Sequence, residues 1–202
     1  MNKYTESDAW DAMDNYRPEH ALKIWNSLIL ESENKDEIDN FKSNSCYALL
    51  GLNRIDEARE IYIELFNKHK NHQYAHQLCM VEREAKNYKK ALKYLEIEKG
   101  LISQNDILAK SANLYEYGKI NELMGEFSIA MDYAQKCIKE SLKCDDLIML
   151  ACANRLLGDI YSHSDIDEAA VCYIQAQKYF TNAGDDFGAK EVEELIEGLD
   201  NE

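Results

Sequence analysis

Glycine and proline are scarce in this chain of 202 residues, which has eight glycines and a single proline, Pro18. A fold built from many short strands needs such turn residues at frequent intervals, and a disordered linker is richer in them still. Hydrophobic residues make up 46% of the chain, which is typical of a globular protein. The composition therefore predicts a single, mostly helical domain over residues 1–202.

Long apolar runs are also missing. The longest, Leu147 to Ala153, spans seven residues, whereas a membrane helix needs roughly 20. The first residues contain no basic and apolar leader, so we expect a cytoplasmic protein that does not contact a membrane. In that compartment the six cysteines are expected to be reduced thiols.

Positive charge is in deficit, with 23 basic against 38 acidic residues and a formal net charge of −15. Such a surface repels nucleic acids and anionic membranes and attracts basic proteins. The sequence therefore predicts a protein or peptide partner with a basic surface and no nucleic-acid partner. An alternative is that the acidity only keeps the protein soluble.

Motifs of catalysis are absent as well: there is no glycine-rich phosphate loop, no GxSxG and no HExxH. We expect no enzymatic activity and no cofactor. His72, His76 and Cys79 would share one helical face and form a weak candidate for a metal site. Because Cys79 occupies a packing position of the repeat described next, a structural role is favoured over metal binding.

The chain does contain a repeated pattern: a small residue, a second residue four positions later and a third after three more, usually apolar. Five copies begin at Ala21, Ala58, Ala91, Ala130 and Ala169, separated by 37, 33, 39 and 39 residues. This spacing is typical of repeats that consist of two antiparallel helices and are about 34 residues long in total. Pro18 suits the first turn of a helix, and Gly100 and Gly184 suit helix ends.

Two segments carry the pattern most fully, LYEYGKINELMGEFSIAMDYAQKCI and NRLLGDIYSHSDIDEAAVCYIQA. With Gly118, Gly125 and Ala130 at small-residue positions, they resemble tetratricopeptide repeat (TPR) motifs. The resemblance covers nearly the whole chain. It departs from the family pattern at Cys46 and Cys79, which replace small residues, in the SHSD turn, which is one residue short, and in the lack of a proline that ends each unit.

The resemblance implies an all-α fold: a right-handed superhelical solenoid of about five antiparallel helix pairs with a C-terminal capping helix. The expected units are 4–32, 37–68, 72–99, 104–141 and 145–182, followed by a capping helix at 185–199. In TPR-like proteins the first helix of each pair lines a concave groove that holds a partner. The corresponding residues here include Trp10, Met13, Tyr47, His76, Met80, Arg83, Tyr115, Lys119, Glu122, Arg155 and Asp159.

These residues favour a protein–protein interaction module, because aromatic and arginine side chains dominate the energetics of many interfaces. Three functions remain open. The chain could be an adaptor that binds a peptide in its groove, an immunity-type neutraliser that blocks a basic toxin or effector, or a secretion chaperone. An adaptor should bind several ligands weakly, whereas a neutraliser should bind one partner tightly and in a salt-sensitive manner.

Overall fold

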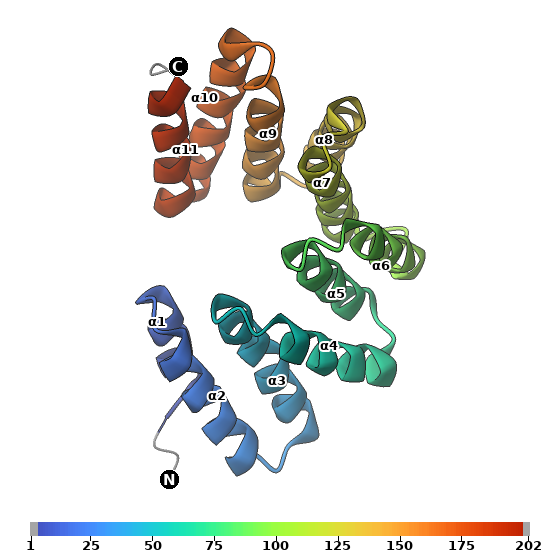
Figure 1. Cartoon of the computed structure of the whole chain (residues 1–202), viewed down its shortest axis with the longest axis vertical. Coiled ribbons are helices and arrows are strands. Elements are labelled where there is room, and N and C mark those ends of the chain that lie inside the picture. The colour runs from blue at the N-terminus through green and yellow to red at the C-terminus, as the bar shows by residue number, and fades with distance from the viewer. Residues whose placement is uncertain (1–3, 200–202) are drawn as a thin grey trace. The chain divides into compact units, whose positions relative to one another are not determined.

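Helices account for all regular secondary structure in residues 4–199, the part of the chain that the computed structural model describes. In order they are α1 Glu6–Asp14, α2 Pro18–Glu31, α3 Lys35–Gly51, α4 Ile55–His69, α5 His72–Glu84, α6 Tyr88–Leu101, α7 Ile107–Leu123, α8 Phe127–Ser141, α9 Leu147–Tyr161, α10 Ile166–Ala183 and α11 Asp186–Leu199 (Figure 1). The predicted all-α fold of about five helix pairs and a final helix is confirmed. None of the described helices is long and apolar enough to cross a membrane.

The chain divides into two compact units, Met1–Tyr94 and Leu95–Glu202, with the boundary inside α6. The first unit holds α1 to α5 and the start of α6, and the second holds the rest of α6 and α7 to α11. Consecutive helices pack against each other from α1 to α5 in the first unit and from α7 to α11 in the second, as Figure 1 shows for α9, α10 and α11.

Local sequence explains where most helices begin and end. Thr5 and Asp8 form a capping box at α1, and Pro18 is the first residue of α2. Gly184 ends α10 in the left-handed conformation with a φ of 75°. The expectation for Gly100 is wrong: this residue lies inside α6, which continues to Leu101.

The turns inside the helix pairs repeat one geometry. Tyr16, Asn53, Lys86 and Gly125 each adopt a positive φ, and the amide that follows each of them donates to the carbonyl five residues earlier. The fifth turn differs, because the Asp165 amide donates to the carbonyl of Tyr161, four residues earlier, at 2.7 Å. Four residues, 162–165, link α9 to α10, whereas three residues link the helices of each of the other four pairs, so the expectation of a shorter SHSD turn is wrong.

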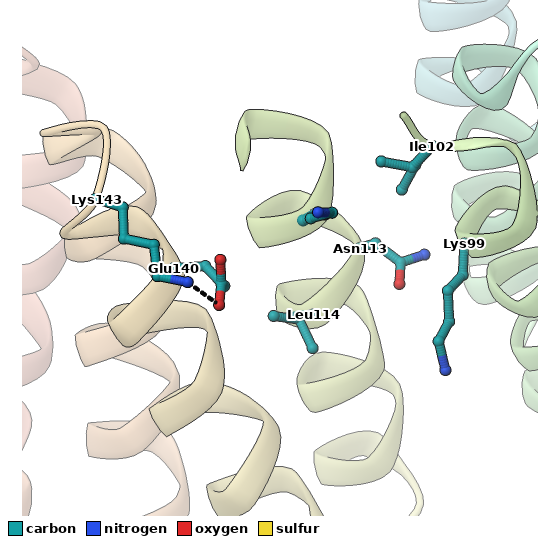
Figure 2. A pocket seen from close by; sticks show the side chains of 7 residues that line it. Lys99, Ile102, Asn113, Leu114, Glu140 and Lys143 are labelled. Atoms are coloured by element: carbon teal, nitrogen blue, oxygen red, sulfur yellow. Dashed lines mark hydrogen bonds and ion pairs between the residues drawn. The ribbon is translucent and has the colours of Figure 1, made fainter. Parts of the chain in front are cut away.

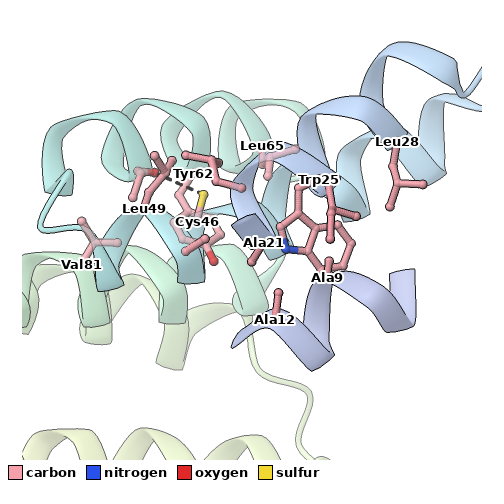
Figure 3. Close-up of a cluster of buried hydrophobic side chains, with 14 of the residues drawn as sticks. Ala9, Ala12, Ala21, Trp25, Leu28, Cys46, Leu49, Tyr62, Leu65 and Val81 are labelled. Carbon is pink, nitrogen blue, oxygen red and sulfur yellow. Dashed lines mark hydrogen bonds between the residues drawn. The ribbon is translucent and has the colours of Figure 1, made fainter. Parts of the chain in front are cut away.

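The repeated alanines occupy buried positions of the helices. All five lead alanines are fully buried. Figure 3 shows the core of the first unit, where Trp25, Tyr62 and Leu65 pack with the small side chains of α1 and α2. Cys46 is also fully buried, and burial raises the pKa of its thiol to about 12, so that it stays protonated.

Two glycines of the second unit permit close helix contact. A Cβ atom added at Gly118 would lie 2.8 Å from Leu156 Cδ2, and one added at Gly158 would lie 2.4 Å from two ring carbons of Tyr173. Both distances are too short for a real contact, so the packing of these helices depends on the missing side chains.

Replacing Gly158 by alanine should therefore destabilise the protein by about 1–3 kcal/mol, because the added methyl group displaces the Tyr173 ring. Gly198→Ala is the matched control, since a Cβ atom there meets no atom within 4 Å. The control should be neutral or stabilise α11 by up to about 1 kcal/mol. Urea unfolding followed by circular dichroism measures both changes, and a Gly158→Ala variant as stable as Gly198→Ala would contradict the packing described.

Candidate functional site

The predicted groove residues lie on the first helices of the pairs, and every one of them is partly exposed. This set belongs to two surfaces. The α1–α3–α5 surface, in the first unit, includes Trp10, Met13, Tyr47, His76, Met80 and Arg83. The α7–α9–α11 surface, in the second unit, includes Tyr115, Lys119, Arg155 and Asp159, together with Glu122 on α7 and Glu191 on α11.

Side-chain contacts join neighbouring helices across the α1–α3–α5 surface. Asn44 Nδ2 donates to Glu6 Oε1 at 3.0 Å and links α3 to α1. The rings of Trp10 and Tyr47 lie 5.7 Å apart between their centroids, and Gln77 Nε2 donates to the Tyr47 hydroxyl at 3.2 Å. Tyr47 therefore contacts both α1 and α5, and its ring is held in place by both.

Trp10 is at once a surface residue and a core contact. Its ring meets that of Trp25 edge to face, with the centroids 5.5 Å apart, and Met13 packs on the same core. Both side chains keep part of their area exposed. Such anchored apolar side chains offer contact area to a partner at a low cost in conformational entropy.

His76, Met80 and Arg83 form one stripe along α5. Arg83 Nη2 lies 3.3 Å from Glu84 Oε1. The metal candidate is not assembled: Cys79 is fully buried in the core. In residues 4–199 no three His, Cys, Asp or Glu side chains are grouped so that they could hold a metal ion.

The α7–α9–α11 surface is a network of charges. Lys119 Nζ lies 3.0 Å from Glu122 Oε2 and 3.3 Å from Asp159 Oδ2, which joins α7 to α9. Arg155 Nη1 lies 2.8 Å from Glu191 Oε2 and joins α9 to α11. Carboxylates therefore flank both cations of this surface.

Local electrostatics keeps Arg155 charged and Tyr173 neutral. Burial lowers the pKa of Arg155, but the nearby charges of Glu191 and Asp159 outweigh it and leave the pKa raised. Burial, followed by the charge of Asp159, raises the pKa of Tyr173, whose hydroxyl donates to Asp159 Oδ1 at 3.0 Å. Tyr173 thus keeps its proton and holds Asp159 in position.

No protein-family model matches this sequence, and no curated protein is significantly similar to it. Solved structures are similar over almost the whole chain. A thermophilic TPR protein from Thermus thermophilus has a TM-score of 0.70 and 14% identity, covering 96% of this chain and 98% of its own. BtubC (BKLC) from P. vanneervenii has a TM-score of 0.60 and 14% identity, covering 97% of this chain and 89% of its own. MamA has a TM-score of 0.56 and 13% identity, covering 87% of this chain and 96% of its own.

The chain has a TPR fold. At these identities the similarity establishes the fold and leaves the partner open. The chemistry of a partner has to be inferred from the exposed side chains of the chain itself.

Negative charge is unevenly distributed along the TPR fold. Residues 95–202 contain 22 acidic and nine basic residues, a net charge of −13, whereas residues 1–94 contain 16 and 14, a net charge of −2. Almost all of the net negative charge of the protein thus belongs to the second unit. The sequence contains this information, but it becomes visible only once the boundary between the units is known.

Two residues of the charged network were missed by sequence analysis. Glu191 lies on α11, which we expected only to cap the fold, and Tyr173 lies on α10, the second helix of its pair. Their partners Arg155 and Asp159 were predicted. The pairs Arg155–Glu191 and Asp159–Tyr173 lie 36 and 14 residues apart in sequence, and no local pattern relates them.

Proposed function

We propose that this protein is a non-catalytic interaction module whose α7–α9–α11 surface binds a basic segment of a partner polypeptide. The concentration of negative charge in the second unit, −13 against −2, is the observation that carries this proposal. A field of this size accelerates the approach of a basic partner and weakens as salt is added.

The chemistry of the surface suits lysine and arginine side chains. Glu122, Asp159 and Glu191 carry three negative charges, whereas Lys119 and Arg155 carry two positive charges. An incoming guanidinium or ammonium group would share Asp159 and Glu191 with the resident cations and form charge-assisted hydrogen bonds. The half-buried ring of Tyr115 adds apolar contact area on α7.

The α1–α3–α5 surface is proposed as a separate contact surface of a different character. The first unit, to which this surface belongs, is nearly neutral. The main features of the surface are the aromatic pair Trp10 and Tyr47, with Met13 on α1 and Met80 on α5. Such a surface suits the apolar side chains of a partner, and the strength of apolar contacts depends little on salt.

A matched pair of variants tests the charged surface. Asp159→Asn with Glu191→Gln should weaken partner binding about tenfold or more, because each replaced carboxylate loses a charge-assisted hydrogen bond. Asp167→Asn with Glu193→Gln removes the same charge from exposed positions of the same unit and should leave the affinity within about twofold. The partner is retained from a lysate of the source organism on immobilised protein, identified by mass spectrometry and titrated by calorimetry.

Equal weakening by both pairs of substitutions would show that total charge, and not this surface, controls binding. Binding that does not change between low and high salt would contradict the proposal altogether. Melting curves of both variants show whether the fold is retained, since Asp159 also accepts a hydrogen bond from Tyr173.

The charge concentration also favours a second candidate, a dedicated neutraliser of a basic toxin or effector. A neutraliser should retain one partner in equimolar amount and block its activity, whereas an adaptor should retain several partners that share a short basic segment. The same retention experiment distinguishes the two candidates by stoichiometry.

A further inference from the structure

A pocket of about 360 Å³ lies within the second unit and shares no lining residue with the α7–α9–α11 surface. It forms where the end of α6, the start of α7 and the end of α8 meet, and Figure 2 shows its lining. The lining residues are Lys99, Ile102, Lys110, Asn113, Leu114, Glu140 and Lys143. None of them belongs to the surface proposed above.

The charge of this pocket is opposite to that of its unit. Three of the nine basic residues of the second unit line it, although the unit carries a net charge of −13. Lys143 Nζ lies 2.6 Å from Glu140 Oε1, so these two charges balance. Among the residues that line the pocket, Lys99 and Lys110 then leave an excess of two positive charges.

The two excess cations have weaker partners. Lys110 Nζ donates to the backbone carbonyl of Gln104, and Lys99 Nζ lies 3.9 Å from Glu96 Oε1, at the limit of an ion pair between two exposed side chains. A neutral carbonyl and a distant carboxylate stabilise an ammonium group less than a direct contact with an anion does. Both lysines can therefore gain from an anionic ligand.

The rest of the pocket is apolar and firmly built. Ile102 and Leu114 line it. Asn113 is buried, and its Nδ2 donates to the Leu95 carbonyl at 3.1 Å and to Glu98 Oε2 at 2.8 Å. These bonds keep α7 and the end of α6 together, so the pocket exists before any ligand arrives.

We propose that this pocket binds a small phosphate monoester with an apolar body. The dianionic phosphate group matches the two excess charges of Lys99 and Lys110, and the apolar body covers Ile102 and Leu114. Lysine is a common phosphate ligand in proteins, and the pocket volume lies within the range of small-molecule sites.

The size of the ligand follows from electrostatics. An anionic membrane or an acidic protein would meet the net charge of −13 over a wide area and be repelled. A small ligand inside the pocket mainly feels charges within a Debye length, about 8 Å at physiological salt. Among the residues that line the pocket, three lysines stand against one carboxylate.

Calorimetric titration of phenyl phosphate into the full chain tests the proposal. We expect binding at one site, and we expect Lys99→Ala with Lys110→Ala to weaken it about tenfold or more through the loss of two charge-assisted contacts. Lys136→Ala with Lys190→Ala is the control, because it removes the same charge from ion pairs outside the pocket. The control should bind phenyl phosphate as the wild type does.

Further probes separate the parts of the ligand. Inorganic phosphate and benzyl alcohol should each bind more weakly than phenyl phosphate, because each lacks one of the two groups that the pocket accommodates. Amide shifts in two-dimensional NMR spectra of the unaltered chain should be largest at Asn113, Leu114 and Lys143, a readout that needs no variant.

Four outcomes would overturn the proposal: no phenyl phosphate binding at millimolar concentration, inorganic phosphate bound equally well, equal losses in both double variants, or shifts outside the pocket. Binding of anionic phospholipid vesicles through Lys99 and Lys110 in place of phenyl phosphate would also overturn it, in favour of a membrane surface. The acidic surface is not involved, so these results are independent of the partner-binding experiment.

Discussion

Replacing Glu82 by alanine should lower the free energy of unfolding by about 3–5 kcal/mol, because it removes a fully buried carboxylate and leaves the largely buried Arg59 guanidinium without this acceptor. Glu82 is fully buried on α5. Its Oε1 accepts from Arg59 Nε at 2.7 Å and from Lys90 Nζ at 2.6 Å, and its Oε2 accepts from Asn87 Nδ2 at 3.0 Å. One carboxylate therefore joins α4, α5 and the start of α6.

Glu57→Ala is the matched control for this experiment. Glu57 also pairs with an arginine, Arg54, at 2.6 Å, but both side chains are about half exposed. An exposed pair contributes about 0–1 kcal/mol. Urea unfolding at neutral pH compares the two variants, and equal losses would contradict the role assigned to Glu82.

The same carboxylate makes the stability of the protein depend on pH. Burial raises the pKa of Glu82, but the hydrogen bonds from Lys90, Asn87 and Arg59 outweigh it, so its pKa lies below the ordinary value of 4.5. The pKa of Asp39 is likewise lowered, because the hydrogen bonds from Lys68 and His69 outweigh the effect of burial. A lowered folded-state pKa stabilises the protein above the unfolded-state pKa, and this stabilisation is lost as the pH falls toward the folded-state value.

We therefore expect the wild type to lose stability as the pH falls below about 4.5. A Glu82→Gln variant, already less stable at neutral pH, should lose less over the same range, because it no longer binds that proton on unfolding. Urea midpoints measured from pH 7 to pH 3 show the two slopes, and parallel slopes would contradict the lowered pKa of Glu82.

Trp25→Ala is expected to have an effect of similar size, about 3–5 kcal/mol, because it removes the largest fully buried side chain of the first unit. The ring contacts Trp10, and its centroid lies 5.9 Å from that of Phe41. Its loss leaves a cavity between α1, α2 and α3 and removes the ring behind Trp10. The proposed α1–α3–α5 surface should therefore lose its order along with its stability.

Trp25→Phe provides the comparison. The Trp25 Nε1 atom is buried and meets no hydrogen-bond acceptor among residues 4–199, so phenylalanine gives up no hydrogen bond and keeps most of the ring contacts. We expect it to cost clearly less than Trp25→Ala. Thermal unfolding monitored by the fluorescence of Trp10 measures both variants, and equal costs would show that packing at this site contributes little.

Most of the fold could be predicted from short-range patterns. The alanines at 21, 58, 91, 130 and 169, Pro18 and Gly184 act within one or two helical turns, and they locate the helices and their pairs. The TPR resemblance implied, in addition, that the first helix of each pair lines the groove that holds a partner. Gly100 does not end its helix, because an exposed glycine can stay helical when nothing requires a positive φ.

The candidate site could be predicted in part. The sequence placed Trp10 and Tyr47, and Lys119 and Asp159, on related helical positions, and the structure brings both pairs into contact. No sequence pattern predicted that Glu191 lies beside Arg155, or that Lys99, Lys110 and Lys143 line one pocket.

The sequence by itself therefore determined the helices, their pairing and the overall acidity, because helical periodicity, capping and composition are local or additive properties. Only the tertiary structure decided which charges meet, where the unit boundary divides −13 from −2, and that three lysines gather in an acidic unit. The physical reason is that electrostatic contacts depend on distance in space, and the packing of helices sets that distance for residues tens of positions apart.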